Sequence, residues 1–147
     1  MKGRYVLAIA AMILLCCGEM SAQRANYGLT GIVGLQSGYG TPARARAEVA
    51  YETAGGFLFG AGIEANYYWD VLVTPYVDAR MTFNDYKVAP FASLNLGYAI
   101  GSSFDGSLLA GARIHLKNNP KKSLWFGGGL GVFIGQIYCP IRAEFSF

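Results

Sequence analysis

From residue 23 onward, apolar and polar residues alternate in segments of about ten residues. The segment 71–84 shows the pattern most clearly, because Thr74, Tyr76, Asp78, Arg80 and Thr82 share one parity and apolar residues hold most of the other. Successive side chains of a β-strand point to opposite faces, so each segment predicts a strand with one polar and one apolar face. Since no segment shows a helical period, the pattern predicts an all-β fold.

Eight such segments follow one another, separated by short turns. We expect strands at 27–37, 42–52, 56–69, 71–84, 88–101, 105–117, 122–135 and 136–147. In the first and seventh segments glycine occupies many positions, and the alternation there is less regular. Turn residues separate the segments at Gly38-Tyr39-Gly40, Gly55-Gly56, Asn84-Asp85, Gly101-Ser102 and Asn118-Asn119-Pro120. Short turns make consecutive strands antiparallel neighbours, so we expect an up-and-down meander.

The first 22 residues predict a cleaved secretory signal peptide. Lys2 and Arg4 precede an apolar stretch that ends at Cys17, and two small residues come before Gln23. The stretch is too short to span a membrane as a helix. A lipoprotein signal is the alternative, but the residue before a lipidated cysteine should be small, and here it is Leu or Cys.

The remaining residues, 23–147, have the length of a single domain and little charge. In the full chain 53% of residues are hydrophobic and 14% are charged, yet no later apolar run approaches the ~20 residues of a membrane-spanning helix. Removing Lys2, Arg4 and Glu19 from the 12 basic and 9 acidic side chains leaves a formal charge of +2. No basic block indicates a nucleic-acid partner. Cys139 is the only cysteine left, so an internal disulfide is excluded.

The charged side chains of the predicted strands gather on one face, and the opposite face is almost free of charge. The charged face holds Arg44, Arg46, Glu48, Glu64, Asp78, Arg80, Arg113, Arg142 and Glu144. In a soluble barrel such a face points to water, whereas in a transmembrane barrel it lines the interior and the apolar face meets lipid. Predicted export and the similar number of both signs favour the transmembrane barrel.

Aromatic residues near the predicted strand ends also favour a membrane barrel, because aromatic girdles mark both interfaces of such proteins. One rim is expected to hold Tyr27, Tyr51, Phe57, Phe83, Trp125 and Phe147, and the other Tyr67, Trp69, Tyr98 and Tyr138. A tilted spanning strand needs about 9–11 residues, which the segments supply. An even number of strands places both termini on the periplasmic side.

The last six residues, Arg142-Ala143-Glu144-Phe145-Ser146-Phe147, resemble the C-terminal assembly signal of outer-membrane proteins. Together with Gly-Ala-Gly-Ile-Glu-Ala-Asn-Tyr-Tyr at 60–68 and Pro-Phe-Ala-Ser-Leu-Asn-Leu-Gly-Tyr at 90–98, they make residues 23–147 similar to the small Gram-negative outer-membrane β-barrels of the OmpA-membrane-domain or OmpX type. The resemblance implies a location in the cell outer membrane, contact with outer-membrane lipid, and recognition of Phe145 and Phe147 by the barrel-assembly machinery. Unlike OmpA, no peptidoglycan-binding domain is expected; unlike OmpX, the outer turns are too short for a protruding sheet.

The interior of an eight-stranded barrel is just wide enough to be filled by side chains. We therefore expect the nine charged residues to form an ion-pair network rather than line a conducting pore, which is the alternative. Two groups of partners are expected: Asp78 and Arg80 with Arg113, and Arg44 and Arg46 with Glu48 and Glu64.

Nothing in the sequence predicts an enzyme, a metal site or a cofactor. His115 is the only histidine and has no nucleophile motif beside it, so an outer-membrane lipid deacylase or protease is the less favoured alternative. The segment Gly127-Gly128-Gly129 lacks the Lys-Ser/Thr of a phosphate loop, and we expect it to leave room for Tyr76 or Tyr138. The sequence predicts a non-enzymatic, monomeric outer-membrane barrel with a role in envelope structure or surface interaction. A soluble, lipocalin-like periplasmic barrel with an apolar ligand inside is the alternative.

Overall fold

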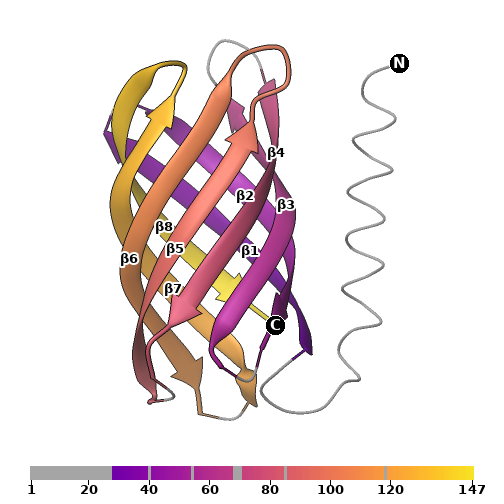
Figure 1. Ribbon diagram of the computed structural model, residues 1–147, viewed down its shortest axis with the longest axis vertical. Coiled ribbons are helices and arrows are strands. Elements are labelled where there is room, and N and C mark those ends of the chain that lie inside the picture. The colour runs from indigo at the N-terminus through magenta and orange to yellow at the C-terminus, as the bar shows by residue number, and fades with distance from the viewer. Residues whose placement is uncertain (1–27, 40, 54, 68–70, 85, 118) are drawn as a thin grey trace.

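The computed structural model describes residues 28–39, 41–53, 55–67, 71–84, 86–117 and 119–147. Eight strands follow one another and form a closed barrel in which each pairs with its neighbours along the chain and β1 pairs with β8 (Figure 1). The strands are β1 Gly28–Tyr39, β2 Thr41–Glu52, β3 Phe57–Tyr67, β4 Val71–Thr82, β5 Val88–Tyr98, β6 Phe104–Leu116, β7 Asn119–Phe133 and β8 Gln136–Ser146. All pairs are antiparallel, which confirms the predicted meander and its closure. The predicted signal peptide, residues 1–22, lies outside the described residues.

The two ends of the barrel differ in what they carry. The start of β1, the C-terminus and the β4–β5 and β6–β7 hairpin ends lie together, and we call this the terminal end (Figure 1). The β5–β6 and β7–β8 turns lie at the opposite end, which we call the tip end. Phe147 closes the terminal end: its N–H donates to the Gly31 carbonyl at 2.9 Å, and its own carbonyl accepts from the Gly31 N–H at 3.1 Å.

Burial follows the predicted two-residue period. In β4 every second residue from Thr74 to Thr82 is buried, while Val77 and Met81 between them are exposed. In β8 the residues from Tyr138 to Ser146 alternate in the same way. The buried parity is the one that carries the charges, so the barrel turns its polar face inward and its apolar face outward. Among the described residues no helix is long and apolar enough to cross a membrane.

Two strands extend by two or more residues beyond the predicted bounds, β1 at its end and β7 at its start. β7 begins at Asn119 instead of residue 122, because Leu116 pairs with Asn119 after a register shift next to His115. Gly38 and Tyr39, expected in a turn, belong to β1. Gly38 lies so close to β8 that a Cβ there would be 2.2 Å from the Cys139 carbonyl oxygen, which explains the glycine.

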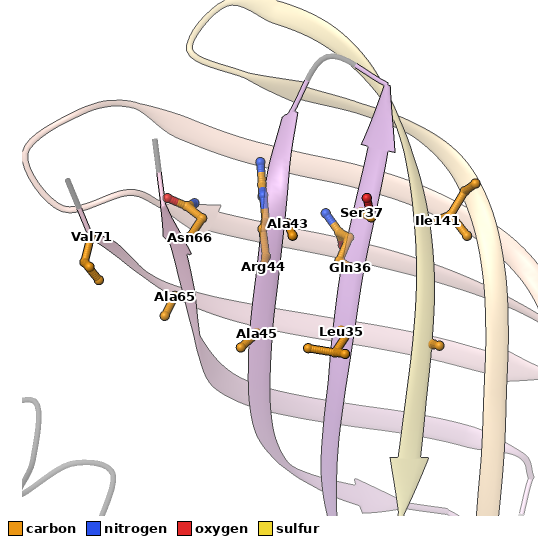
Figure 2. Close-up of a pocket in the computed structure, with 11 residues that line it drawn as sticks. Leu35, Gln36, Ser37, Ala43, Arg44, Ala45, Ala65, Asn66, Val71 and Ile141 are labelled. Carbon is orange, nitrogen blue, oxygen red and sulfur yellow. The ribbon is translucent and has the colours of Figure 1, made fainter. Parts of the chain in front are cut away.

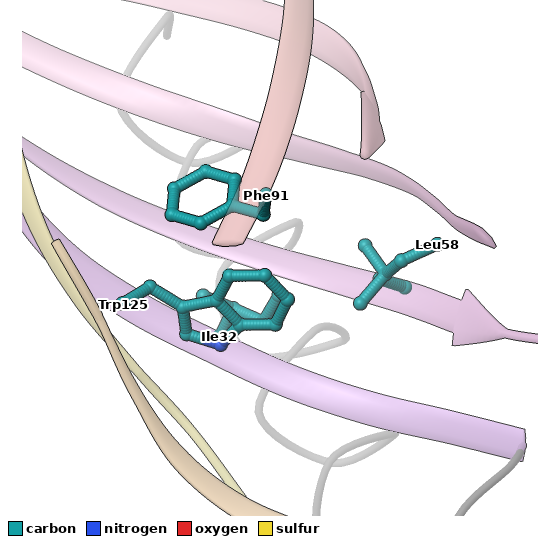
Figure 3. Packing of buried hydrophobic residues seen from close by; sticks show 5 residues of the cluster. Ile32, Leu58, Phe91 and Trp125 are labelled. Carbon is teal, nitrogen blue, oxygen red and sulfur yellow. The ribbon is translucent and has the colours of Figure 1, made fainter. Parts of the chain in front are cut away.

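Two apolar clusters lie inside the barrel, one toward each end. The terminal-end cluster consists of Ile32, Ala50, Leu58, Phe91 and Trp125 (Figure 3). Its Phe91 and Trp125 rings meet edge to face, with centroids 5.0 Å apart. The tip-end cluster consists of Ala99, Phe133 and Tyr138, with Leu72 packed against it.

The prediction that Trp125 and Tyr138 belong to the rim girdles is wrong, because both have inward parity and are buried. The interior also supplies their polar atoms with partners: Trp125 Nε1 donates to Ser146 Oγ at 3.1 Å, and the Tyr138 hydroxyl donates to Asp105 at 3.0 Å. The remaining described girdle residues are exposed as expected, namely Tyr51, Phe57, Phe83 and Phe147 at the terminal end and Tyr98 at the tip end. Tyr27, Trp69 and the side chain of Tyr67 lie outside the described residues.

Candidate functional site

The nine charged residues on the charged face all lie inside the barrel, and each is at most 4% exposed. Two carboxylates that the sequence analysis left out, Glu52 and Asp105, pair with them. Both could have been found from parity, since Glu52 continues the series of Arg44, Arg46 and Glu48 along β2. With these two, the described interior holds five arginines and six carboxylates, so opposite charges nearly balance.

Arg80 occupies the centre of the network and contacts three carboxylates from three strands. Its Nε donates to Asp78 Oδ2 at 2.8 Å and its Nη2 to Glu48 Oε2 at 3.0 Å. Its Nη1 donates to Glu144 Oε2. Asp78 is further held by the Ser93 hydroxyl at 3.0 Å. The guanidinium therefore bridges β2, β4 and β8 across the barrel axis, the arrangement a fully buried arginine requires.

Arg46 connects this centre to the tip-side half of the lumen. Its Nη1 lies 3.2 Å from Glu64 Oε2 and its Nε lies 3.3 Å from Glu144 Oε1. Its guanidinium carbon also lies 4.2 Å from the centroid of the Tyr76 ring. Arg142 lies beside Arg46, and its Nη2 donates to Gln36 Oε1 at 2.7 Å.

Arg44 forms the layer next to the tip-end cluster. Its Nη1 donates to Glu64 Oε1 at 2.7 Å and also to Asp105 Oδ2. Its guanidinium carbon lies 4.6 Å from the Phe133 ring centroid and 5.0 Å from that of Tyr138. The charge is thus enclosed by two carboxylates and two aromatic rings.

Arg113 lies near the terminal end, and its expected pairing with Asp78 is wrong. It pairs with Glu52 instead, with Nη2 donating to Glu52 Oε2 at 2.9 Å. The terminal-end cluster lies between the two groups: the Trp125 ring centroid is 4.4 Å from the Arg113 guanidinium carbon and 5.1 Å from that of Arg80. Parity places Arg113 and Asp78 on the same inner surface but does not give their heights along the axis.

The single histidine has a hydroxyl partner that the sequence analysis did not foresee. His115 Nδ1 lies 3.2 Å from Ser123 Oγ, which also accepts a hydrogen bond from Arg113 Nε at 3.1 Å. Ser123 is 0% exposed. The Ser123 hydroxyl therefore lies in the interior between the His115 ring and the Arg113 guanidinium.

Glycines make room for the large lumenal side chains, although not the glycines that were expected. A Cβ on Gly62 would lie 2.8 Å from the Tyr76 ring, and one on Gly131 would lie 2.4 Å from the Tyr138 ring. A Cβ on Gly127, the first of the three consecutive glycines, would lie 3.0 Å from the Phe91 ring. The aromatic rings therefore pack against bare backbone on the inside of the barrel.

The network does not satisfy every polar atom. Twelve buried side-chain nitrogen and oxygen atoms of the described residues have no hydrogen-bond partner in the protein, including both amide atoms of Asn66 and the hydroxyls of Thr74 and Thr82. Buried groups of this kind in proteins bind ordered water. Among the described residues no group of three or more His, Cys, Asp or Glu side chains is placed to hold a metal ion.

A groove of about 590 Å³ lies in the outer wall across β8, β1, β2 and β3, with Val71 of β4 also lining it (Figure 2). Small and aliphatic outward side chains line most of it, including Ala43, Ala45, Ala65, Leu35 and Ile141. Gln36, Arg44 and Asn66 also border it, and all three are almost fully buried. The groove thus presents an apolar surface to the surroundings of the barrel.

No known protein family profile matches the chain, and no curated protein matches it. Solved structures do. A designed protein, described as "De novo design of transmembrane beta-barrels", superimposes with a TM-score of 0.63 at 13% identity, covering 85% of this chain and 98% of that one. The N-terminal β-barrel domain of Pseudomonas aeruginosa OprF gives 0.56 at 12% identity, covering 83% and 100%. Neisserial surface protein A (NspA) gives 0.51 at 14% identity, covering 80% and 92%. The chain therefore has the fold of eight-stranded transmembrane β-barrels.

Proposed function

We propose that this protein is an integral outer-membrane β-barrel, with a lumen closed by side chains and no enzymatic activity. The observation that carries the proposal is the direction of the two faces. All nine predicted charges point inward, while large apolar side chains such as Leu108, Ile137 and Ile141 are 62%, 76% and 69% exposed.

Such a surface is stable in lipid and costly in water. Soluble monomers rarely expose contiguous apolar patches larger than a few hundred Å², whereas exposed apolar side chains occur here on every strand. The strands have 11 to 15 residues, enough for a tilted crossing of the hydrocarbon layer. The soluble lipocalin-like alternative would need the apolar face inside, and the structure has the opposite arrangement.

The outer membrane is favoured over other membranes by two separate arguments. Residues 1–22 have the pattern of an export signal. The fold is shared with OprF and NspA, which come from Pseudomonas aeruginosa and from Neisseria. For any membrane, a closed barrel is one of only two backbone structures that satisfy their own hydrogen bonds in lipid.

A structural role in the envelope is favoured over surface interaction. The two described turns at the tip end, at 99–103 and 134–135, are only a few residues long. Loops of this length form no protruding sheet and offer little surface to a partner outside the cell. The lumen likewise supports no transport, because apolar clusters lie toward both ends of a side-chain network.

Assembly is the one step for which we propose a protein partner. Phe145 and Phe147 share the outward parity of β8, and their ring centroids lie 6.2 Å apart. This pair of aromatic rings at the end of the last strand is available to the barrel-assembly machinery before closure. Changing Phe147 to Ser should reduce insertion into the outer membrane while export and signal cleavage continue.

Membrane fractionation tests the proposal directly. The protein should remain with the outer membrane after carbonate and high-salt washes, and its mobility on a gel should change after boiling. Recovery in the soluble periplasmic fraction would overturn the membrane assignment. Hydrolysis of lipid or peptide substrates that disappears in His115→Ala would overturn the non-enzymatic assignment.

A further inference from the structure

In the described barrel, the arginine and carboxylate side chains lie inside and the lysine side chains lie outside. All five described arginines are buried in the lumen, and the described carboxylates pair with them. The three lysines whose side chains are described, Lys87, Lys117 and Lys122, are all exposed. None of the three forms an ion pair with another described residue.

The three lysines lie close together at the terminal end. Lys87 directly precedes β5, and its carbonyl accepts a hydrogen bond from the His115 N–H of β6 at 2.9 Å. Lys117 directly follows β6. Lys122 lies on β7 next to Ser123, which pairs with His115. We call Lys87, Lys117 and Lys122 the lysine rim.

Exposed aromatic residues lie at the same level. Phe83 and Tyr86 belong to the β4–β5 connection beside Lys87, and both are more than half exposed. Aromatic rings and long basic side chains are typical of the zone where a membrane meets water, since their apolar parts contact lipid and their polar ends reach the surface. Asp85 and the side chain of Lys121 lie outside the described part of the structure, and these two residues carry opposite charges.

The described part of the tip end carries no exposed charged side chain. The described residues of its turns include Ile100 and Ile134, and Phe104 of β6 and Ile137 of β8 lie next to them, all four exposed. No described residue of the β5–β6 or β7–β8 turn is basic or acidic. The outside of the described barrel is therefore uncharged except for a positive patch at one end.

We propose that the lysine rim binds the phosphate headgroups of anionic phospholipids in the leaflet on the side of the termini. This inference rests on the proposed function, because it needs the barrel to be in a membrane. Lysine suits this role since its ammonium is a hydrated point charge on a flexible stem, whereas the rigid forks of arginine serve the buried network. Each basic side chain near an anionic surface contributes roughly 1 kcal/mol to the binding free energy, which corresponds to about a fivefold change in the binding constant.

Spin-labelled lipids in vesicles with the full-length mature protein test the proposal. We would compare the motion-restricted fraction of spin-labelled phosphatidylglycerol with that of spin-labelled phosphatidylcholine. The wild type should prefer phosphatidylglycerol by about fivefold at each lipid site that a lysine contacts. High salt should weaken that preference, because the patch is exposed.

Two matched variants identify the groups responsible. The triple variant K87Q/K117Q/K122Q should lose the preference, and the triple variant K87R/K117R/K122R should keep it, because it retains the charges. An unchanged preference in the glutamine variant, or equal restriction of the two lipids by the wild type, would overturn the lysine-rim proposal alone. If no lipid were restricted at all, the proposed membrane function itself would fail. Both variants should show the wild-type change in gel mobility on heating, which reports that the barrel has folded.

Discussion

Arg80 shows how single residues determine the stability of the lumen. Its guanidinium is the shared donor for Asp78, Glu48 and Glu144, and it is fully enclosed by the barrel. Without it, three carboxylates would face one another at short range with only Arg46 and Arg142 nearby. Loss of one carboxylate, by contrast, leaves Arg80 with two others. The network is therefore more sensitive to removal of the cation than of any one anion.

We predict that Arg80→Leu lowers the free energy of unfolding by about 3–5 kcal/mol, the usual cost of leaving buried charges without a partner. Asp78→Asn should cost less, because the amide still accepts hydrogen bonds and Glu48 and Glu144 remain. Lumenal water at unsatisfied polar atoms would reduce both values. Urea unfolding of the protein in lipid vesicles measures them. A larger loss in Asp78→Asn than in Arg80→Leu would show that Arg80 is not the centre of the network.

At the scale of residues, the sequence predicted the inward face and the pairing of Glu64 with Arg44 and Arg46. It did not predict that Glu48 pairs with Arg80 or that Arg113 pairs with Glu52. Parity alone placed Arg113 and Asp78 on one surface, and they were expected to pair. The stagger between strands sets their separation along the axis, and Trp125 fills the space between them. This stagger is set by how all eight strands close into a barrel, so it cannot be predicted from the sequence of any single strand. Tyr138 was likewise assigned to a rim from its position near a strand end, although its parity already pointed inward.

At the scale of strands, β6 and β7 leave no room for a Cβ at two glycines that face the lumen. A Cβ on Gly129 would lie 1.9 Å from the Leu108 carbonyl oxygen, and one on Gly111 would lie 1.9 Å from that of Phe126. Neither contact can be relieved by rotating a side chain, because the obstacle is backbone. Glycine richness made the bounds of β7, like those of β1, hard to predict from the sequence, and two of the glycines are required by the packing of β6 against β7.

Two adjacent glycines of β7 provide a matched test of this packing. We predict that Gly129→Ala lowers the free energy of unfolding by about 1–3 kcal/mol, the usual cost of overpacking. Gly128→Ala should be close to neutral, because its Cβ would point outward and meet only the Pro140 oxygen at 3.4 Å. The midpoint of heat-induced gel mobility change compares the two variants. Equal midpoints would mean that the strands can separate without cost.

The facing of β5 gives a test of which side meets lipid. Leu94 lies in the middle of this strand, paired with Ala79 and Leu108, and is 47% exposed on the outer face. We predict that Leu94→Arg costs about 2–4 kcal/mol in vesicles, as expected for a charge near the bilayer midplane. Leu94→Phe is the control and should be tolerated, since it remains apolar. A neutral effect of the arginine would place this face in water.

At the scale of the whole molecule, the interior is a stack of layers. Arg113 and Glu52 lie nearest the terminal end, followed by the terminal-end cluster, the Arg80 network, Arg44 with its carboxylates, and the tip-end cluster. The number of strands, their order and the inward face were all predictable, because each follows from segment count and parity. The layering was not predictable. Apolar residues such as Ile32, Leu58 and Leu109 stand among the polar residues on the inward face, and only the closed barrel shows at which height along the axis they lie.

The layered interior predicts a barrel that does not conduct ions. Purified protein in planar bilayers should show no steady channel current. Trp125→Ala alone should also remain silent, because the tip-end cluster still closes the lumen, whereas Trp125→Ala combined with Phe133→Ala should produce intermittent steps as both apolar obstructions shrink. Phe126→Ala removes an exposed ring next to Trp125 and controls for loss of an aromatic side chain on the same strand. Stable, ion-selective steps in the wild type that disappear when Arg80 or Glu144 is changed would replace the closed lumen with a charged pore.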